Sequence, residues 1–261
     1  MPPKSEQKKS EKSKESDCGI CKWTTIGAVC TLYYGDSDQK QSLVITLIAV
    51  VISAYMEHDR IASTVRRFAH PNLPPLSVPD PFLLPRPEQE SILNILKPTD
   101  NIRTFYLVTG EHGTGKTTLV RQACWNVSTG VIYVEVPADY QLFAPALANA
   151  VDFHFDLPVW TERAVSDFSV VLNHILVAAR EYRNIYGVPP VLVIDDINIL
   201  VEHDRTNFDI LLRAAKKAAD DRVLIVVLVS SEGKGPRYIL SIIIFLVFCF
   251  FKFKARVLHL D

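Results

Sequence analysis

From residue 88 onward, short apolar runs alternate with longer segments in which apolar residues recur every three or four positions. A run that is apolar at every position is typical of a strand buried on both faces, and the longer periodic segments predict helices. This alternation indicates an α/β fold, with a parallel sheet between layers of helices. We expect strands at 105–109, 131–136, 191–196 and 223–231, and helices at 88–96, 116–125, 141–150, 166–186 and 206–219.

A separate apolar stretch, LVITLIAVVISAYM, covers residues 43–56 and contains no charged residue. Its fourteen residues fall short of the ~20 that a helix needs to cross a bilayer without thinning it. Lysines precede the stretch and arginines follow it, so the distribution of positive charge favours neither orientation. A buried helix and a membrane span both remain open.

A second apolar run, residues 238–251, is followed by Lys252 and Lys254. It fits a short membrane span whose flanking lysines reach the interface. It also fits a fifth strand with an apolar extension. A third alternative is that an interrupted reading frame follows Arg237, because the pattern of the domain breaks abruptly there.

Two polar segments divide the chain. Residues 1–17 are almost entirely Lys, Glu, Ser and Asp, which predicts a disordered tail, and residues 71–87 contain seven prolines, which predicts an extended linker. We therefore expect five parts. They are a tail with cysteines at 1–41, an apolar segment at 42–70, a linker at 71–87, the α/β domain at 88–237 and an apolar C-terminal segment at 238–261.

The formal net charge of −1 gives no strong nucleic-acid signal. Five scattered cysteines do not form a disulfide framework, and no secretory signal is visible, so we expect an intracellular protein that associates with a membrane through 42–56, 238–251 or both. Cys18 and Cys21 have the spacing of half a zinc site, but no second pair follows, which favours reduced cysteines without a metal.

The sequence GEHGTGKT, between the first expected strand and its helix, fits the phosphate-binding pattern G-x-x-x-x-G-K-[ST]. Glycines let the backbone approach an anion closely, and the following helix adds the positive end of its dipole. The fold class is therefore a three-layer P-loop NTPase. The residues expected to bind the nucleotide here are Gly110, Glu111, His112, Gly113, Thr114, Gly115, Lys116, Thr117 and Thr118.

Two side chains of this loop carry specific chemistry. Lys116 is expected to contact the β- and γ-phosphates as a compact positive charge, and Thr117 to ligate Mg²⁺ through its hydroxyl. No N-K-x-D sequence of the kind that reads guanine is visible, so ATP is the expected nucleotide.

Asp195 and Asp196 follow the apolar run 191–194. A carboxylate at the end of a buried parallel strand lies at the edge where such folds bind ligands, so we expect Asp195 to hold Mg²⁺. Asp196 is a candidate general base for the attacking water. A capping role is the alternative for both residues, and it is the stronger for Asp196.

The last expected strand ends in Ser230 and Ser231. If this strand lies between the P-loop strand and the aspartate strand, one of these hydroxyls is placed to contact the γ-phosphate or the attacking water. The alternative is an ordinary turn at the end of a strand.

Taken together, these segments resemble the AAA+/STAND branch of P-loop ATPases, in particular the archaeal-type ATPase domains and their expanded relatives in fungi. The resemblance covers residues 82–237, which are 156 of the 261 residues. It rests on LPRPEQESIL, GEHGTGKTTLVR, GVIYVEVP, VLVIDDINIL and VLIVVLVSSEGKGPR. In such families the segment that leads into the core packs near the adenine, which implies that Arg86 and Glu88 lie on the base side of the nucleotide.

The chain also departs from this family. A glutamate usually stands where Asp196 does, and after Arg237 no segment matches the helical lid with its nucleotide-sensing arginine. The resemblance implies an ATP-dependent switch with Mg²⁺-assisted hydrolysis and a protein partner. The alternative is a catalytically weak or truncated nucleotide-binding protein anchored at a membrane, and a transferase acting on a small acceptor is a weaker third.

Overall fold

The computed structural model describes residues 37–75, 86–97, 104–153, 168–231 and 255–260. The chain falls into two compact units, Met1–His58 and Asp59–Asp261. The predicted tail, the Cys18–Cys21 pair and the apolar run 238–251 lie outside the described residues. Of the predicted linker, residues 71–75 are described and form neither helix nor strand.

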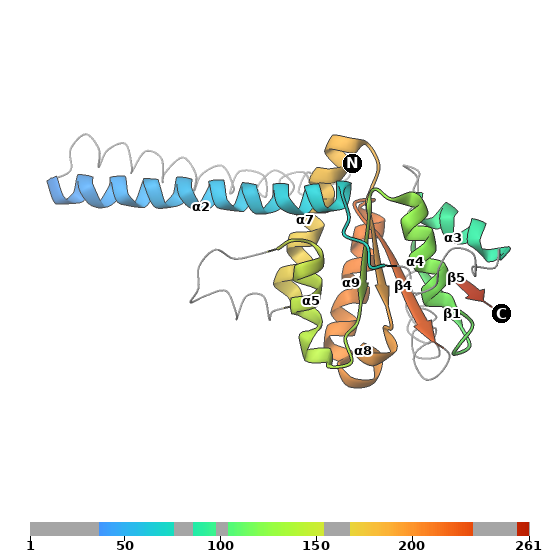
Figure 1. Ribbon diagram of the computed structural model, residues 1–261. Helices are drawn as coiled ribbons and strands as arrows, with labels where there is room; N and C mark the ends of the chain where they lie inside the picture. The colour runs from blue at the N-terminus through green and yellow to red at the C-terminus, as the bar shows by residue number, and fades with distance from the viewer. Residues whose placement is uncertain (1–36, 76–85, 98–103, 154–167, 232–254, 261) are drawn as a thin grey trace, which may run out of the picture. The chain divides into compact units, whose positions relative to one another are not determined.

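The larger unit is built on one parallel sheet with the strand order β2-β3-β4-β1-β5 (Figure 1). This arrangement confirms the predicted α/β fold with its parallel sheet, and it adds a fifth described strand after the apolar run 238–251 rather than within it. The strands are β1 (Phe105–Gly110), β2 (Val131–Glu135), β3 (Val191–Asp195), β4 (Ile225–Ser231) and β5 (Ala255–Leu260).

The predicted helices of the domain are all present, with small shifts of their ends. The expected helix at 141–150 begins as a 3-10 turn, η2 (Tyr140–Leu142), before α5 (Phe143–Ala150). One further helix, α8 (Asn198–His203), was not predicted, because six residues are too few to display a helical period. The others are α3 (Glu88–Leu96), α4 (Lys116–Val127), α7 (Phe168–Tyr186) and α9 (Arg205–Asp220).

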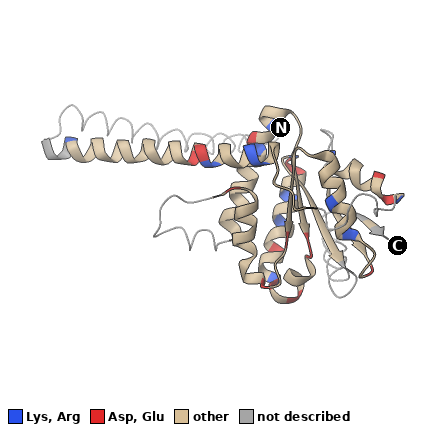
Figure 2. Cartoon of the chain, viewed as in Figure 1, with Lys and Arg blue, Asp and Glu red and all other residues tan. Residues whose placement is uncertain are grey.

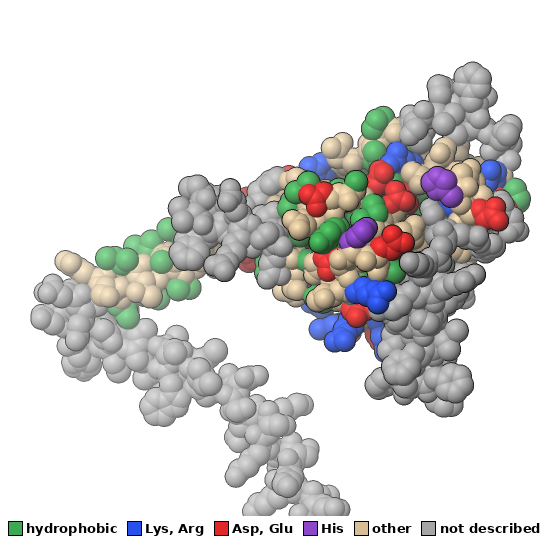
Figure 3. All heavy atoms as spheres, turned by 90° about the horizontal axis from the view of Figure 1, so that it is seen from below, with side chains coloured by type: hydrophobic (Ala, Val, Ile, Leu, Met, Phe, Trp, Pro, Cys, Tyr) green, Lys and Arg blue, Asp and Glu red, His purple; other side chains and the backbone are tan. Residues whose placement is uncertain are grey.

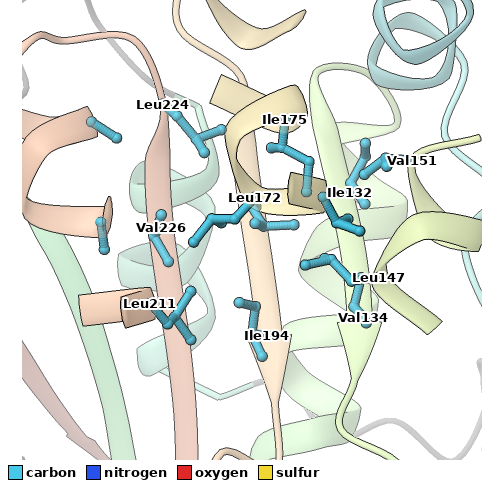
Figure 4. Packing of buried hydrophobic residues seen from close by; sticks show 14 of the residues in the cluster. Ile132, Val134, Leu147, Val151, Leu172, Ile175, Ile194, Leu211, Leu224 and Val226 are labelled. Carbon is cyan, nitrogen blue, oxygen red and sulfur yellow. The ribbon is translucent and has the colours of Figure 1, made fainter. Parts of the chain in front are cut away.

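The strands are apolar at every position because each face of the sheet is covered by helices. Along β3, Leu192 and Ile194 pack with α5, α7 and α9. The close-up of this core shows Ile194 among side chains of these helices (Figure 4). Val191 and Val193 point to the other face and pack with α3 and α4. Alternate side chains of a strand point to opposite faces, so a strand between two helical layers must be apolar throughout. The result is the three-layer arrangement expected from the sequence.

Helix α2 (Ser37–Ala69) also contributes to this core through its last residues. Val65 and Phe68 are buried with the α5 and α7 side chains, and the Phe68 carbonyl accepts a hydrogen bond from Gly130 N at 2.8 Å. The buried Thr64 hydroxyl donates to the Val151 carbonyl at 2.8 Å. The sequence analysis did not anticipate this contribution, because charged residues interrupt the apolar pattern after Met56.

The apolar stretch 43–56 lies in the first part of the same helix. Its large side chains between Val44 and Tyr55 are exposed, the least of them Val44 at 43% and the most Tyr55 at 71%. No Lys, Arg, Asp or Glu side chain interrupts it (Figure 2), and hydrophobic side chains lie along both of its sides in the space-filling view (Figure 3).

Candidate functional site

The loop between β1 and α4 has the backbone shape expected of a phosphate-binding loop. Gly113 and Gly115 adopt φ values of +86° and +79°, in the left-handed region that side chains with a Cβ rarely enter. A Cβ placed on Gly113 would meet no heavy atom within 4 Å, so open space lies against the backbone there. Gly115 caps α4, whose first N–H groups face the loop. The geometry suits a bound anion such as a phosphate chain.

Lys116 begins α4, and its side chain turns back over the loop. Its ammonium group donates to the carbonyl oxygens of Gly110 at 2.7 Å and Glu111 at 2.5 Å, and it lies 3.4 Å from the Thr114 hydroxyl oxygen. The residue is buried, so these oxygens stabilise a charge that is largely removed from water. The loop therefore holds a compact positive charge at the place that the motif predicts.

The other predicted residues of the loop divide by exposure. Glu111 and His112 are exposed, whereas Thr117 and Thr118, in the first turn of α4, are half-buried. The Thr114 hydroxyl donates to the Glu111 carbonyl at 2.9 Å and so closes the turn. Thr114 thus maintains the shape of the loop, in addition to its predicted place in the nucleotide site.

Arg86 lies beside the same loop. A Cβ on Gly115 would stand 4.0 Å from one terminal nitrogen of the exposed Arg86 guanidinium group. The sequence analysis assigned Arg86 to the base side of the nucleotide on the strength of the resemblance. The structure brings its charge to the phosphate loop, where a planar cation with several donors suits phosphate oxygens.

The strand order gathers the polar residues at one edge of the sheet. β4 lies between β1 and β3, as the expectation for Ser230 and Ser231 required, and all three strands are parallel. Thr109 of β1 pairs with Ser230, and Gly110 pairs with Ser231. The carboxyl ends of these strands therefore meet, and the glycine loop and the aspartates leave the sheet on the same side.

Asp195 points toward the helical layer that contains the phosphate loop's helix. It follows Val193 by two positions, and Val193 packs with α3 and α4, so the two side chains share a face. Asp195 is 1% exposed. Its main-chain carbonyl accepts a hydrogen bond from Val136 N at 2.9 Å, and its side-chain Oδ1 accepts one from Asp196 N at 2.9 Å. Burial, with a smaller contribution from the negative charge of Asp195, raises the pKa of the Cys124 thiol in α4 to about 12.

The second oxygen of Asp195 has a partner that the sequence did not reveal. The Tyr133 hydroxyl of β2 donates to Asp195 Oδ2 at 2.6 Å, and Arg121 Nε of α4 donates to the Tyr133 hydroxyl oxygen at 3.0 Å. Arg121 also forms an ion pair with Glu135. Burial and the Asp195 charge raise the pKa of the Tyr133 phenol well above its usual range. Tyr133 and Arg121 both lie in segments that carry the family resemblance, but nothing in the sequence links them to Asp195, which follows them by 62 and 74 positions.

Asp196 occupies a strained position. It has a φ of +57°, which is uncommon for a residue other than glycine and is found mostly at turns and functional sites. Burial raises the pKa of its carboxyl group, and the charges of Asp195 and Glu135 raise it further, against the opposing effects of Arg121 and His112. A carboxylate that retains its proton more strongly than usual fits a candidate general base.

Ser230 is 1% exposed at the end of β4, and its hydroxyl donates to the Asn198 side-chain oxygen of α8. Ser231 is the last residue of β4 and the backbone partner of Gly110. Asn198 was missed in the sequence analysis, although it stands only two positions after Asp196. Its place in the unpredicted helix α8 explains why.

The described residues also bear on the metal. No cluster of three or more His, Cys, Asp or Glu side chains suited to a metal ion occurs among them. Mg²⁺ with a nucleotide does not require one, since it is usually held by one or two carboxylates together with water and phosphate oxygens. A single buried, hydrogen-bonded carboxylate at the same sheet edge as an open glycine loop fits that form of binding.

A family model described as an AAA domain matches residues 100–233, just over half of the 261 residues. No curated protein matches the chain. The matched range contains the glycine loop, both aspartates and Ser230 and Ser231.

Among solved structures, the Walker-type ATPase PABY2304 of Pyrococcus abyssi is 16% identical, with 69% of this chain aligned to 55% of that one at a TM-score of 0.47. AMPPCP-bound DnaA from Aquifex aeolicus is 19% identical, with 73% aligned to 51% at 0.39. Cdc6p from Pyrobaculum aerophilum is 19% identical, with 61% aligned to 42% at 0.42. The chain thus spans about half of each of these proteins, and likeness at this level supports no further conclusion.

Proposed function

The chain belongs to the AAA domain family, and on that premise we propose that it is an AAA+ P-loop ATPase domain of the archaeal type that acts as an ATP-dependent switch with Mg²⁺-assisted hydrolysis. The observation that carries the proposal is the glycine loop. Its two left-handed glycines, its capped helix and its buried lysine supply the positive, open surface that a triphosphate requires.

Each site residue has a separate task in this proposal. Main-chain N–H groups from Gly110 to Thr118 surround the phosphates, and Lys116 neutralises their charge, exchanging its loop carbonyls for phosphate oxygens. Arg86 adds a second positive charge from outside the loop. Thr117 and Asp195 would hold Mg²⁺, which would supply positive charge to stabilise the charge that develops during phosphoryl transfer.

The remaining polar residues act on water. Asp196 accepts the proton of the attacking water or orients it, and Ser230, fixed by Asn198, senses the γ-phosphate at the end of the central strand. Ser231 has the same role in the proposal if its hydroxyl, rather than that of Ser230, reaches the phosphate.

The test is ATP binding and phosphate release by the full chain in mild detergent. Lys116→Ala removes a buried charge that contacts phosphate, and we expect ATP to bind about 100-fold more weakly or worse. Lys217→Ala, in the last turn of α9 and exposed, is the matched control and leaves binding unchanged. Unaltered ATP binding in the Lys116 variant would refute the site. Tight binding without phosphate release would favour the non-hydrolysing alternative.

A second candidate role, membrane anchoring, is favoured by the first part of α2. A helix long and apolar enough to cross a membrane covers Lys40–Ala69, although its last residues pack in the domain core. Large apolar side chains cover much of its circumference between Val44 and Tyr55, and the remaining positions are Thr46, Ala49, Ser53 and Ala54. An interfacial helix would have a strongly charged face, which this segment lacks, so a short span with local bilayer thinning is the better description.

Flotation with phosphatidylcholine liposomes tests the anchor. We expect the full chain to float and the double variant Ile48→Glu, Val51→Glu to remain in the soluble fraction, because charges at the centre of a span are costly. Ile185→Glu is the control, since Ile185 is 59% exposed outside this segment. If the double variant floats as well as the wild type, this segment does not anchor the protein.

A further inference from the structure

Tyr133 and Arg121 have no task in the proposed function, yet they are joined to its metal-holding carboxylate. Tyr133 is 7% exposed and donates its hydroxyl to Asp195 Oδ2 at 2.6 Å. We propose that Tyr133, with Arg121 behind it, is a positioning residue that fixes the Asp195 carboxylate for Mg²⁺ bound with a nucleotide. This inference rests on the proposed function and adds to it a requirement of this chain's own residues.

The sheet register places the tyrosine where it can act in this way. In the parallel pairing of β2 and β3, Tyr133 is opposite Val193, and Glu135 is opposite Asp195. Tyr133 and Asp195 therefore lie on the same face of neighbouring strands, two positions apart, and a long aromatic side chain spans that diagonal. This is also the face that packs against α4, the helix that begins at the phosphate loop.

The hydrogen bonds determine which way the phenolic proton points. Arg121 Nε can only donate, and it donates to the Tyr133 hydroxyl oxygen at 3.0 Å. The hydroxyl proton is then free to point at Asp195 Oδ2, which is an acceptor as a carboxylate. The guanidinium carbon lies 5.1 Å from the centre of the Tyr133 ring, which adds a cation–π contact to the same pair. The ion pair of Arg121 with Glu135 holds the guanidinium group from its other side.

Two donors on different oxygens fix a carboxylate more completely than one. Asp196 N holds Oδ1 at 2.9 Å, and this bond alone allows the carboxylate to turn about its Cβ–Cγ bond. The Tyr133 hydroxyl on Oδ2 removes that freedom and leaves a lone pair on each oxygen for further contacts. Partners behind a metal ligand of this kind typically contribute 10- to 100-fold to metal affinity.

A purely structural role for Tyr133 makes a different prediction. In that case Tyr133→Phe would lower stability and affect nucleotide binding equally with and without metal. A positioning role predicts that binding of the nucleotide alone is unchanged and only its dependence on Mg²⁺ moves. The phenylalanine ring retains the packing in the α3–α4 core, so the change is confined to one hydroxyl group.

The experiment measures binding of fluorescent mant-ATP to the full chain as Mg²⁺ is titrated from zero. We expect Tyr133→Phe to raise the Mg²⁺ concentration at half-effect by about 10- to 100-fold, with metal-free binding within about 2-fold of wild type. Tyr182→Phe is the matched control, because Tyr182 is also buried, at 5% exposure, and packs in the other core with Phe68. It should leave the Mg²⁺ midpoint unchanged.

Arg121→Gln provides a second variant if Tyr133→Phe does not fold. It removes the donor behind Tyr133 but leaves the phenol in place, so the midpoint should move in the same direction by a smaller factor. A wild-type midpoint in both variants would overturn the inference. Lys116→Ala in the same assay distinguishes failure of the positioning role from failure of the proposed function. If it abolishes binding while the Tyr133 and Arg121 variants behave as wild type, only the positioning role fails, and if it has no effect, the proposed function fails.

Discussion

The ends of β1 and β3 lie at the same edge of the sheet but are built in different ways. After β1 the chain offers backbone: glycines at positive φ, a helix end, and a lysine bound by carbonyl oxygens of its own loop. After β3 it offers a side chain, Asp195, held by Tyr133 and, through it, by Arg121. A site made of main-chain groups is formed by a short local sequence, whereas a site made of side chains from distant segments forms only once the chain has folded.

The difference has a thermodynamic consequence. The loop after β1 can bind an anion by itself, since its donors and its charge are contiguous in sequence from Gly110 to Thr118. The carboxylate after β3 cannot attract a phosphate and contributes only when a cation lies between them. We therefore expect the end of β1 to contribute to ATP affinity with or without metal, and the end of β3 to contribute only when metal is present.

The largest expected effect is that of Asp195→Asn on the dependence of ATP binding on Mg²⁺. The amide is nearly the same size and can still accept from Tyr133, but it carries no charge. We expect the tightening of ATP binding by Mg²⁺ to fall by about 100-fold or more, while binding without metal is retained. Calorimetric titration with ATP, with and without Mg²⁺, measures both. An equal loss in the two titrations would mean that the β3 end does not act through the metal.

A variant with a smaller expected effect tests whether the loop after β1 binds ATP. Gly113→Ala and Gly187→Ala place the same methyl group at φ values of +86° and +78°, each in open space. Both should therefore lower the free energy of unfolding by about 1–2 kcal/mol through backbone strain alone. Only Gly113→Ala should also weaken ATP binding, because only that Cβ stands against the phosphates. Denaturant unfolding and ATP titration distinguish the two costs, and equal ATP affinity in both variants would argue against the loop as the binding surface.

The smallest effect concerns the charge gathered at the β3 end. The folded protein raises the pKa of Asp196 above its ordinary value of 3.8, so the folded state holds this proton more tightly than the unfolded chain. Stability from this group is therefore present at low pH and is lost as pH rises through the window between 3.8 and the raised folded value. Asp196→Asn should then stabilise the protein at pH 7 by up to about 1 kcal/mol, after allowance for solvent screening.

Thermal unfolding of Asp196→Asn at pH 7 and pH 3.5 checks the sign. The gain should shrink at the lower pH, where the wild-type carboxyl group carries a proton. Asparagine also accepts the left-handed backbone of this position, so strain does not offset the gain. A variant less stable than wild type at pH 7 would show that Asp196 is favourable in its ionised form.

The same contrast explains how much of the molecule could be predicted. The four strands 105–109, 131–136, 191–196 and 223–231 followed from continuous apolar runs, and the structure has them within two residues at each end. The phosphate loop followed from its glycines. Its site assignments stay predictions until a nucleotide is tested, as do those of Asp195, Asp196, Ser230 and Ser231.

What could not be predicted depends on contacts between distant parts of the chain. The hydrogen bond from Tyr133 to Asp195 joins residues 62 positions apart, and no sequence pattern contains both of them. The packing of Val65 and Phe68 into the core was hidden because polar residues surround them in the sequence. Helix α8, which places Asn198 beside Ser230, was too short to show a period.

Backbone hydrogen exchange of the full chain tests the central claim most directly. We predict that ATP without metal slows exchange at the amides of residues 111–118, and that adding Mg²⁺ extends the slowing to residues 195–198. This pattern would show both strand ends engaged, each under its own condition. Unchanged exchange in 111–118 with saturating ATP, or slowing confined to another part of the described sheet, would contradict the account.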